Sequence, residues 1–436
     1  MLAVAPSQIV FDFSAAVPLA TSTVQIIDPT GARTEAPLSN DAAGPDRLVA
    51  AVGPLPAGAI TVRWRLVGPD GHPLTGRVNF TITPPAAAPT TPTPTNTTPA
   101  AAAETSAPPA PTEVMDDGED TAFSVPSALR WLLRYASYLA VMTVIGVVLT
   151  DRYVWPGASR RPVLRQAIQG ALIAIAVLAV AQLLVLTSDI AARTPWASFG
   201  SLDAAIGTGA GMAMAVRLLL AGGLWLLLFH TSPVDEEVRV SALALGGLAM
   251  LGTWAWAGHS ATQRWAEIGF PLDIVHHAAA ALWIAALIVV GVVATPRLDA
   301  DQLTPVVRRL STTASISVAV IAVTGIVQSV RLVGNPAQLF DADHGKYLAI
   351  KLLAVGAMLT AASVNRRRVH AGLGHTSAVT SATVPQLRRT ILVEFALGLV
   401  VIGITSAMVV SPPATTAVTL PAQGDPSTAT THHYSL

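Results

Sequence analysis

The stretch AIQGALIAIAVLAVAQLLVLTS, residues 167–188, decides the fold class because it is apolar along its length and contains no charged side chain. A helix needs roughly 20 apolar residues to cross a hydrocarbon core about 30 Å thick. Similar stretches recur along the chain, and the sequence predicts a membrane all-α bundle of about eight transmembrane helices. The expected spans are 129–150, 167–188, 209–230, 239–258, 273–295, 313–331, 346–364 and 390–410.

The overall composition agrees with a membrane protein. Of the 436 residues, 52% are hydrophobic and 12% are charged, and the mean hydropathy is +0.55. A soluble domain of this length needs more charge to cover its surface. The formal net charge of zero argues against nucleic acid as a partner. Because the chain has no cysteine, any metal ligands must be His, Met, Asp or Glu.

The chain divides into four segments by composition. In residues 1–83, short runs of alternating apolar residues between turn sequences predict a small all-β sandwich or barrel. Residues 84–126 are rich in Pro, Thr and Ala and are expected to form a disordered linker. The helical domain is assigned to 127–411, and residues 412–436 are expected to form a disordered tail.

Basic residues predict the orientation in the membrane. The loops after the odd-numbered spans carry most of the arginines, whereas the opposite loops carry few. Because Lys and Arg accumulate in cytoplasmic loops, both termini and the β domain are expected to be extracytoplasmic. No signal peptide precedes Pro6, so we expect the true start to lie upstream. The alternative is that the first helix exports its own N-terminus.

Several candidate metal ligands fall at the outer ends of the predicted spans. His259 follows the fourth span, His276 and His277 lie near the start of the fifth, and Met212 and Met214 lie in the outer third of the third. Imidazole and thioether ligands together favour copper over hard cations. The alternative interpretation places the histidines at the membrane interface and the methionines in ordinary packing.

Two charged residues of the spans are expected to have partners inside the protein. Asp273 precedes His276 and His277 by three and four residues, and it is expected to orient one of these rings. Arg217 is the most deeply placed charge, and it is expected to pair with Glu394 or with a backbone carbonyl.

The β domain and the tail contain further candidate ligands. The turn Pro69-Asp70-Gly71-His72-Pro73 brings a carboxylate and an imidazole together, which is half of an oxygen–nitrogen Cu(II) site. A chance His in an Asp-Gly turn is the alternative. The pair His432-His433 is interpreted as part of a disordered tail, with metal capture as the alternative. No nucleotide-binding or catalytic motif is found, so the protein is predicted not to be an enzyme.

Some of these residues occur in patterns typical of a known family. Val62–Val67, Asp70–Gly76 and Val78–Phe80 form a Trp-containing strand, an Asp-Gly-His turn and a following strand. Gly258-His259-Ser260 and Asp273–Trp283 form a Gly-His signature and a His-rich helix start. The first set resembles the CopC copper-binding domain and the second resembles the CopD membrane domain, as in CopC–CopD fusions of the copper resistance and copper transport family.

The resemblance implies a Greek-key, immunoglobulin-like β domain that binds Cu(II) through Asp70 and His72. It also implies a membrane domain that carries Cu(I) or Cu(II) past His259 and His276. The CopC site also uses an N-terminal His that precedes the first strand. Because this sequence begins after that strand, the domain is expected to be N-terminally incomplete as written.

The predicted function is the capture of copper outside the cell and its movement across a bacterial plasma membrane, with inward movement expected. The predicted partners are copper ions, the lipid bilayer and a periplasmic or extracellular copper donor. Two alternatives stay open. One is a copper-delivering assembly factor for an outer-face oxidase, without transport. The other is a haem-binding electron carrier with His259 and His276 as axial ligands.

Overall fold

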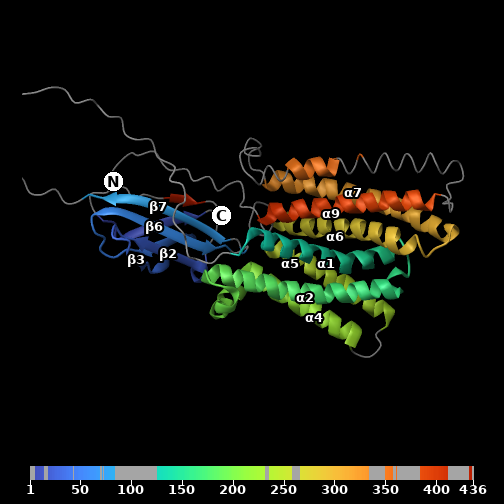
Figure 1. Ribbon diagram of the computed structural model, residues 1–436, viewed down its shortest axis with the longest axis horizontal. Helices are drawn as coiled ribbons and strands as arrows, with labels where there is room; N and C mark the ends of the chain where they lie inside the picture. Colours follow the sequence, from blue (N-terminus) through green and yellow to red (C-terminus); the bar gives the residue numbers. More distant parts are fainter. Residues whose placement is uncertain are drawn as a thin grey trace, which may run out of the picture.

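The computed structural model describes most of the β domain and of the helical bundle. In Figure 1 the β domain lies against one end of a bundle whose helices run along the long axis, and we call this end the outer end. The predicted linker and several candidate ligands, Asp70, His72 and His259, lie outside the described residues. The described residues are 5–13, 18–42, 44–68, 71, 73–83, 125–230, 235–257, 266–332, 349–356, 360, 383–410 and 432–434.

The predicted β domain is confirmed as two packed sheets. The strand orders are β4-β5-β1-β8 and β3-β2-β6-β7, and all neighbours are antiparallel except β1 and β8. Alternating residues of β1 and β6, such as Phe11, Val62 and Leu66, are buried between the sheets. The strands are β1 Gln8–Phe13, β2 Ser22–Ile27, β3 Arg33–Glu35, β4 Leu38–Asp41, β5 Gly44–Ala51, β6 Gly58–Val67, β7 Pro73–Ile82 and β8 His432–Tyr434.

A tryptophan and a facing glycine fix the packing of this core. The ring of Trp64 meets Phe11 and Phe13 edge-on, with centroids 6.4 Å and 6.0 Å apart. Gly76 is its partner across the β6–β7 pair. A Cβ atom at residue 76 would lie 2.4 Å from Cζ2 of Trp64, so a larger residue cannot fit without moving the ring.

We therefore expect Gly76→Val to loosen the β6–β7 pair. Overpacking of this kind costs about 1–3 kcal/mol. Hydrogen exchange of the β6 amides in the full-length protein should become faster. Gly53→Val is the matched control, because a Cβ atom there meets no atom within 4 Å. Equal exchange in the two variants would contradict this packing.

The C-terminal tail differs from the expectation of complete disorder. His432–Tyr434 form β8, which pairs in parallel with β1 in the register Phe11↔His432 and Asp12↔His433. An edge strand has unpaired backbone N–H and C=O groups along its free side, and these can template an added strand. Sequence periodicity cannot identify a segment of three residues that is ordered by such an edge.

The helical bundle contains seven helices that are long and apolar enough to cross a membrane, within the residues described. Six of these helices match predicted spans well, and the remaining one, Ala300–Leu332, begins earlier than its predicted span 313–331. The eighth expected helix, the predicted span 346–364, is described only at residues 349–356 and 360, which are helical. The helices are α1 Ser127–Tyr153, α2 Pro162–Ala191, the short α3 Leu202–Gly207, α4 Gly209–Trp225, α5 Glu236–Ala257, α6 Ala266–Ile288, α7 Ala300–Leu332 and α9 Val384–Val410.

Helix α1 packs closely against α6. A Cβ atom on Gly146 of α1 would lie 2.5 Å from the carbonyl oxygen of Ala281 and 2.5 Å from Cβ of Ala285. Small residues at this contact let the two backbones approach each other. Tyr138, earlier in α1, contacts His277, earlier in α6, so the two helices are parallel and both start at the outer end.

The helix directions require one more crossing of the bundle. Trp131 near the start of α1 donates to the carbonyl of Gly403 near the end of α9, at 2.9 Å. Gln328 near the end of α7 donates to Asp273 near the start of α6. Both α7 and α9 therefore end at the outer end. The chain between them must return to the inner end, which agrees with a span at 346–364.

Candidate functional site

The candidate site lies in the first half of α6, about three turns after Ala266, because the helix begins before the predicted span; His276 and His277 project half-buried into the bundle there. Their ring centroids are 5.8 Å apart and their ring planes are inclined by 77°. Helix α6 places adjacent residues about 100° apart around its axis, so the two rings meet different neighbours. His276 faces α7, whereas His277 faces α1 and α5.

The hydrogen bond of His277 fixes its tautomer. Its Nδ1 lies 2.7 Å from the backbone carbonyl oxygen of Asp273, one helical turn earlier. A carbonyl oxygen only accepts hydrogen bonds, so Nδ1 must carry the proton. In the neutral ring the lone pair is then on Nε2, as in many metal-binding histidines whose other nitrogen donates to a carbonyl.

The same argument applies to His276. Its Nδ1 lies 2.8 Å from Oγ1 of Thr324 on α7. The hydroxyl of Thr324 also lies 2.6 Å from the carbonyl oxygen of Val320. When its proton is directed at that carbonyl, Oγ1 accepts from Nδ1–H of His276, and the lone pair of this ring is also on Nε2. Both imidazoles are prepared to act as ligands through Nε2.

The hydroxyl of Thr324 should be measurable as an orienting group. We expect Thr324→Val, which keeps the shape and removes the hydrogen bond, to lower Cu(I) affinity about 10–100-fold. Competition with a chromophoric Cu(I) chelator measures this affinity in the purified full-length protein. Thr312→Val is the control, because the Thr312 hydroxyl on the same helix donates only to the exposed carbonyl of Arg308. Equal affinities in both variants would show that Thr324 does not orient a ligand.

The expected role of Asp273 is corrected in one respect. Its backbone carbonyl, and not its carboxylate, holds the ring of His277, because the ring folds back along the helix toward the preceding turn. Its carboxylate accepts a hydrogen bond from Gln328 of α7. Lys351, in the helical residues 349–356, lies within electrostatic reach of Asp273, His276 and His277. The site therefore combines a carboxylate, an ammonium group and two imidazoles.

Aromatic side chains form the wall behind His277. The ring centroid of Tyr138 lies 6.2 Å from that of His277, and the centroid of Trp254 lies 5.8 Å from it. Tyr138 and Trp254 contact each other edge-on at 4.5 Å. These rings cover one side of the imidazole, and the sequence had given no signal for either of them.

Arg217 lies on the far side of the same wall and has a partner inside the bundle, as expected. Its guanidinium carbon lies 5.4 Å from the ring centroid of Trp254, and its Nε donates to Oγ1 of Thr253 at 2.6 Å. Within the described part of the chain, the hydrogen-bond partner found for Arg217 is thus a hydroxyl on the neighbouring helix α5. Arg217 is 4% exposed.

The two methionines of α4 lie on different faces. Met214 is half-buried and packs beside Val67, Leu186 and Ala210, where the β domain meets the bundle. Met212 is 39% exposed and faces outward. Two residues along a helix are about 200° apart, so both thioethers cannot share one site. A ligand role for either methionine stays a prediction.

A complete metal site is not assembled within the described part of the chain. No group of three or more His, Asp or Glu side chains there is close enough to hold one ion. The predicted ligands His259, Asp70 and His72 lie outside the described residues, so their roles stay predictions. Thr324, by contrast, is a contact of the site whose role the sequence did not reveal.

Comparisons with known proteins agree with the two-part architecture. The family model of the CopC domain matches residues 1–83. The family model of the copper resistance protein D-like N-terminal domain matches residues 125–267, and that of copper resistance protein D matches residues 304–408. A search of curated proteins finds no match.

One solved structure is similar over the β domain. The crystal structure of CopC from Methylosinus trichosporium OB3b shares 30% sequence identity, with 19% of this chain and 81% of that chain covered and a TM-score of 0.18. The family matches cover the β domain and both halves of the bundle. The chain therefore belongs to the copper resistance family, as a fusion of a CopC domain with a CopD membrane domain.

Proposed function

We propose that this copper-handling membrane protein captures copper outside the cell and moves it inward across the plasma membrane. The β domain takes Cu(II) through Asp70 and His72 in this proposal. The ion then reaches the outer end of the bundle, where His276 and His277, with His259, provide the first ligands of the membrane path. A periplasmic or extracellular donor supplies the copper.

One observation carries the proposal. His276 and His277 both have Nδ1 occupied by an acceptor from the protein, so both offer Nε2 to a ligand. Histidines that merely sit at a membrane interface need no such orientation. Neutral imidazole accepts both oxidation states of copper, which allows an ion to be received and released.

The proposed topology is supported from both ends of the chain. The strand β8 pairs with β1, so the C-terminal residues lie beside the N-terminal domain. An even number of membrane crossings places the N-terminal domain and the C-terminal residues on the same side of the membrane, as this strand pairing requires. With the β domain outside, the membrane potential favours inward movement of a cation by about 2.3 kcal/mol per charge per 100 mV.

The test is the copper content of cells that express the full chain, the His276→Ala/His277→Ala variant or neither, at matched protein levels. We expect the wild-type protein to raise cell copper and the variant not to do so. Lower copper in wild-type cells would overturn inward movement. Unchanged copper together with lower oxidase activity on deletion would replace transport by the assembly-factor alternative. A Soret band in the purified protein would instead identify the haem-binding carrier.

A further inference from the structure

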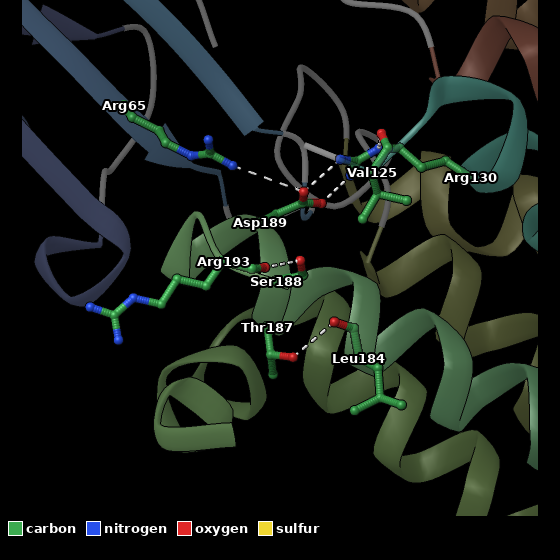
Figure 2. Close-up of polar contacts among 8 residues, drawn as sticks. All are labelled: Arg65, Val125, Arg130, Leu184, Thr187, Ser188, Asp189 and Arg193. Carbon is green, nitrogen blue, oxygen red and sulfur yellow. Dashed lines mark hydrogen bonds and ion pairs between the residues drawn. The ribbon is translucent and has the colours of Figure 1, made fainter. Parts of the chain in front are cut away.

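The contact between the β domain and the bundle is centred on a buried carboxylate that the sequence analysis did not single out. Asp189, near the end of α2, has a side chain that is 1% exposed. Figure 2 shows it between two arginines that come from opposite sides. Arg130 belongs to α1, whereas Arg65 belongs to β6 of the β domain. We call these three residues the Asp189 cluster.

The two arginines bind Asp189 with unequal strength. Arg130 contacts both carboxylate oxygens with its two terminal nitrogens, and its Nε donates to the carbonyl of Val125 at 3.3 Å. Such a bidentate pair is the strong form of a charge-assisted hydrogen bond. Nη2 of Arg65 lies 3.9 Å from Oδ1 of Asp189, beyond hydrogen-bonding distance. The contact within the bundle is therefore tight, and the contact between the domains is looser.

An apolar contact lies next to the Asp189 cluster. Val67, the last residue of β6, is fully buried against Leu186, Ala205 and Ala210 of the bundle. A Cβ atom on Gly71 would lie 2.9 Å from Cβ of Ala210, so the backbone at Gly71 approaches α4 closely. Val67, Leu186, Ala205 and Ala210 are the buried residues of this apolar cluster.

The position of Gly71 connects this interface with copper. Gly71 is the described residue of the turn whose neighbours in sequence are Asp70 and His72. Met214 packs against the same apolar cluster from α4. One turn further along α4, Arg217 contacts Trp254, whose ring contacts His277. The interface and the candidate site are thus connected along α4, through Met214 at the interface and Arg217 one turn further on.

We infer that the Asp189 cluster docks the β domain reversibly onto the outer end of α2 and α4, so that Gly71, in the turn with the predicted copper ligands, lies against α4 of the same chain. The docking itself follows from the interface, whereas its use for copper transfer rests on the proposed function. Because Arg130 keeps Asp189 in place when the β domain leaves, the bundle offers Arg65 a preformed partner. Release then breaks the looser ion pair and the apolar contact and leaves the Arg130–Asp189 pair intact.

Cysteine cross-linking of the full-length protein tests the docking. The chain has no cysteine, so two introduced thiols are the only ones present. The segment Leu19–Thr21 of the β domain packs against α3 of the bundle across the interface. Leu19 and Asp203 are exposed residues of these two segments, and the test variant carries Leu19→Cys and Asp203→Cys. A short bifunctional thiol reagent should link this pair. Leu19→Cys with Val163→Cys is the negative control, because Val163 lies at the opposite end of α2.

The docking variant is Arg65→Glu, which places two carboxylates opposite each other. We expect several-fold less cross-linking in this variant, and less still at low salt, where repulsion is stronger. Arg63→Glu is the matched control, because it makes the same charge change on the same face of β6, two residues further away. Arg65→Lys should cross-link almost as the wild-type protein does. This second variant shows that a positive charge at residue 65 is sufficient for docking, and the protein yield and thermal unfolding of Arg65→Glu show whether that variant is folded.

The outcomes separate docking from copper transfer. Equal cross-linking in Arg65→Glu and Arg63→Glu would overturn the docking. If Arg65→Glu loses cross-linking but cells keep their normal copper accumulation, transfer through the docked state is wrong while the docking stands. If His276→Ala/His277→Ala keeps cross-linking but wild-type cells accumulate no copper, the proposed function fails and the docking is unaffected.

Discussion

Replacing His276 and His277 together with alanine should abolish Cu(I) binding by the membrane domain. Both rings present Nε2 because Nδ1 is hydrogen-bonded to Asp273 or to Thr324. The loss should exceed the ~10–100-fold effect that is typical for removal of an orienting partner alone. Among the residues described, no other pair of histidines in the bundle lies in ring contact.

The measurement is a Cu(I) competition titration of the purified full-length protein, together with X-ray absorption for imidazole scattering. Asp70→Ala/His72→Ala removes the predicted ligands of the β domain and serves as the background for all variants. His230→Ala is the control, because it deletes an imidazole in the segment Leu226–His230, which follows α4 at the inner end. Retained Cu(I) binding with imidazole scattering in His276→Ala/His277→Ala would place the copper ligands elsewhere.

Replacing Asp189 with alanine should give the largest loss of stability in the bundle. The carboxylate is buried and is held by both terminal nitrogens of Arg130, with Arg65 nearby. Removing one partner of a buried ion pair leaves the other charge without compensation, which costs about 3–5 kcal/mol. Because Arg130 lies in the first turn of α1 and Asp189 in the last turn of α2, the variant should also loosen these two helix ends.

Thermal unfolding of the full-length protein in detergent measures this effect, and hydrogen exchange locates it. Asp203→Ala is the control, since Asp203 is an exposed carboxylate on the neighbouring α3. Surface substitutions of this kind usually change stability by less than about 0.5 kcal/mol. If Asp189→Ala behaves as Asp203→Ala does, the cluster contributes little to stability.

Much of the fold could be predicted because each span must be apolar along its length. The ends of the helices were predicted less accurately than their positions in the chain. The sixth predicted span was 313–331, whereas α7 is Ala300–Leu332. Hydropathy marks only the part of a helix that contacts hydrocarbon, and backbone hydrogen bonds continue past it into the polar loop. The additional turns contain Arg308 and Arg309, whose charges lower the mean hydropathy of this part of the helix.

The candidate site could be predicted only in part for a related physical reason. His276 and His277 are polar residues at the start of an apolar span, which is a visible signal. Their partners Thr324 and Tyr138 come from spans that are apolar on nearly every face. Such helices give little indication of which face turns inward. The contacts of the site therefore depend on how each helix is rotated about its own axis. The sequence of a single apolar helix does not indicate this rotation.

Asp189 illustrates the same limit. In sequence it is one acidic residue after an apolar run, which is an ordinary position at the end of a membrane helix. Its importance depends on Arg130 of α1 and on Arg65, which is more than a hundred positions earlier in another domain. Only the packing of α1, α2 and the β domain brings these charges together.

Copper flux into sealed proteoliposomes tests the central claim most directly. The full-length protein is reconstituted with the β domain outside, an inside-negative potential is imposed, and radioactive copper is added outside. We predict copper accumulation in the lumen with the wild-type protein and none with His276→Ala/His277→Ala. Equal accumulation in wild-type and protein-free vesicles, with copper binding intact, would contradict transport by this protein.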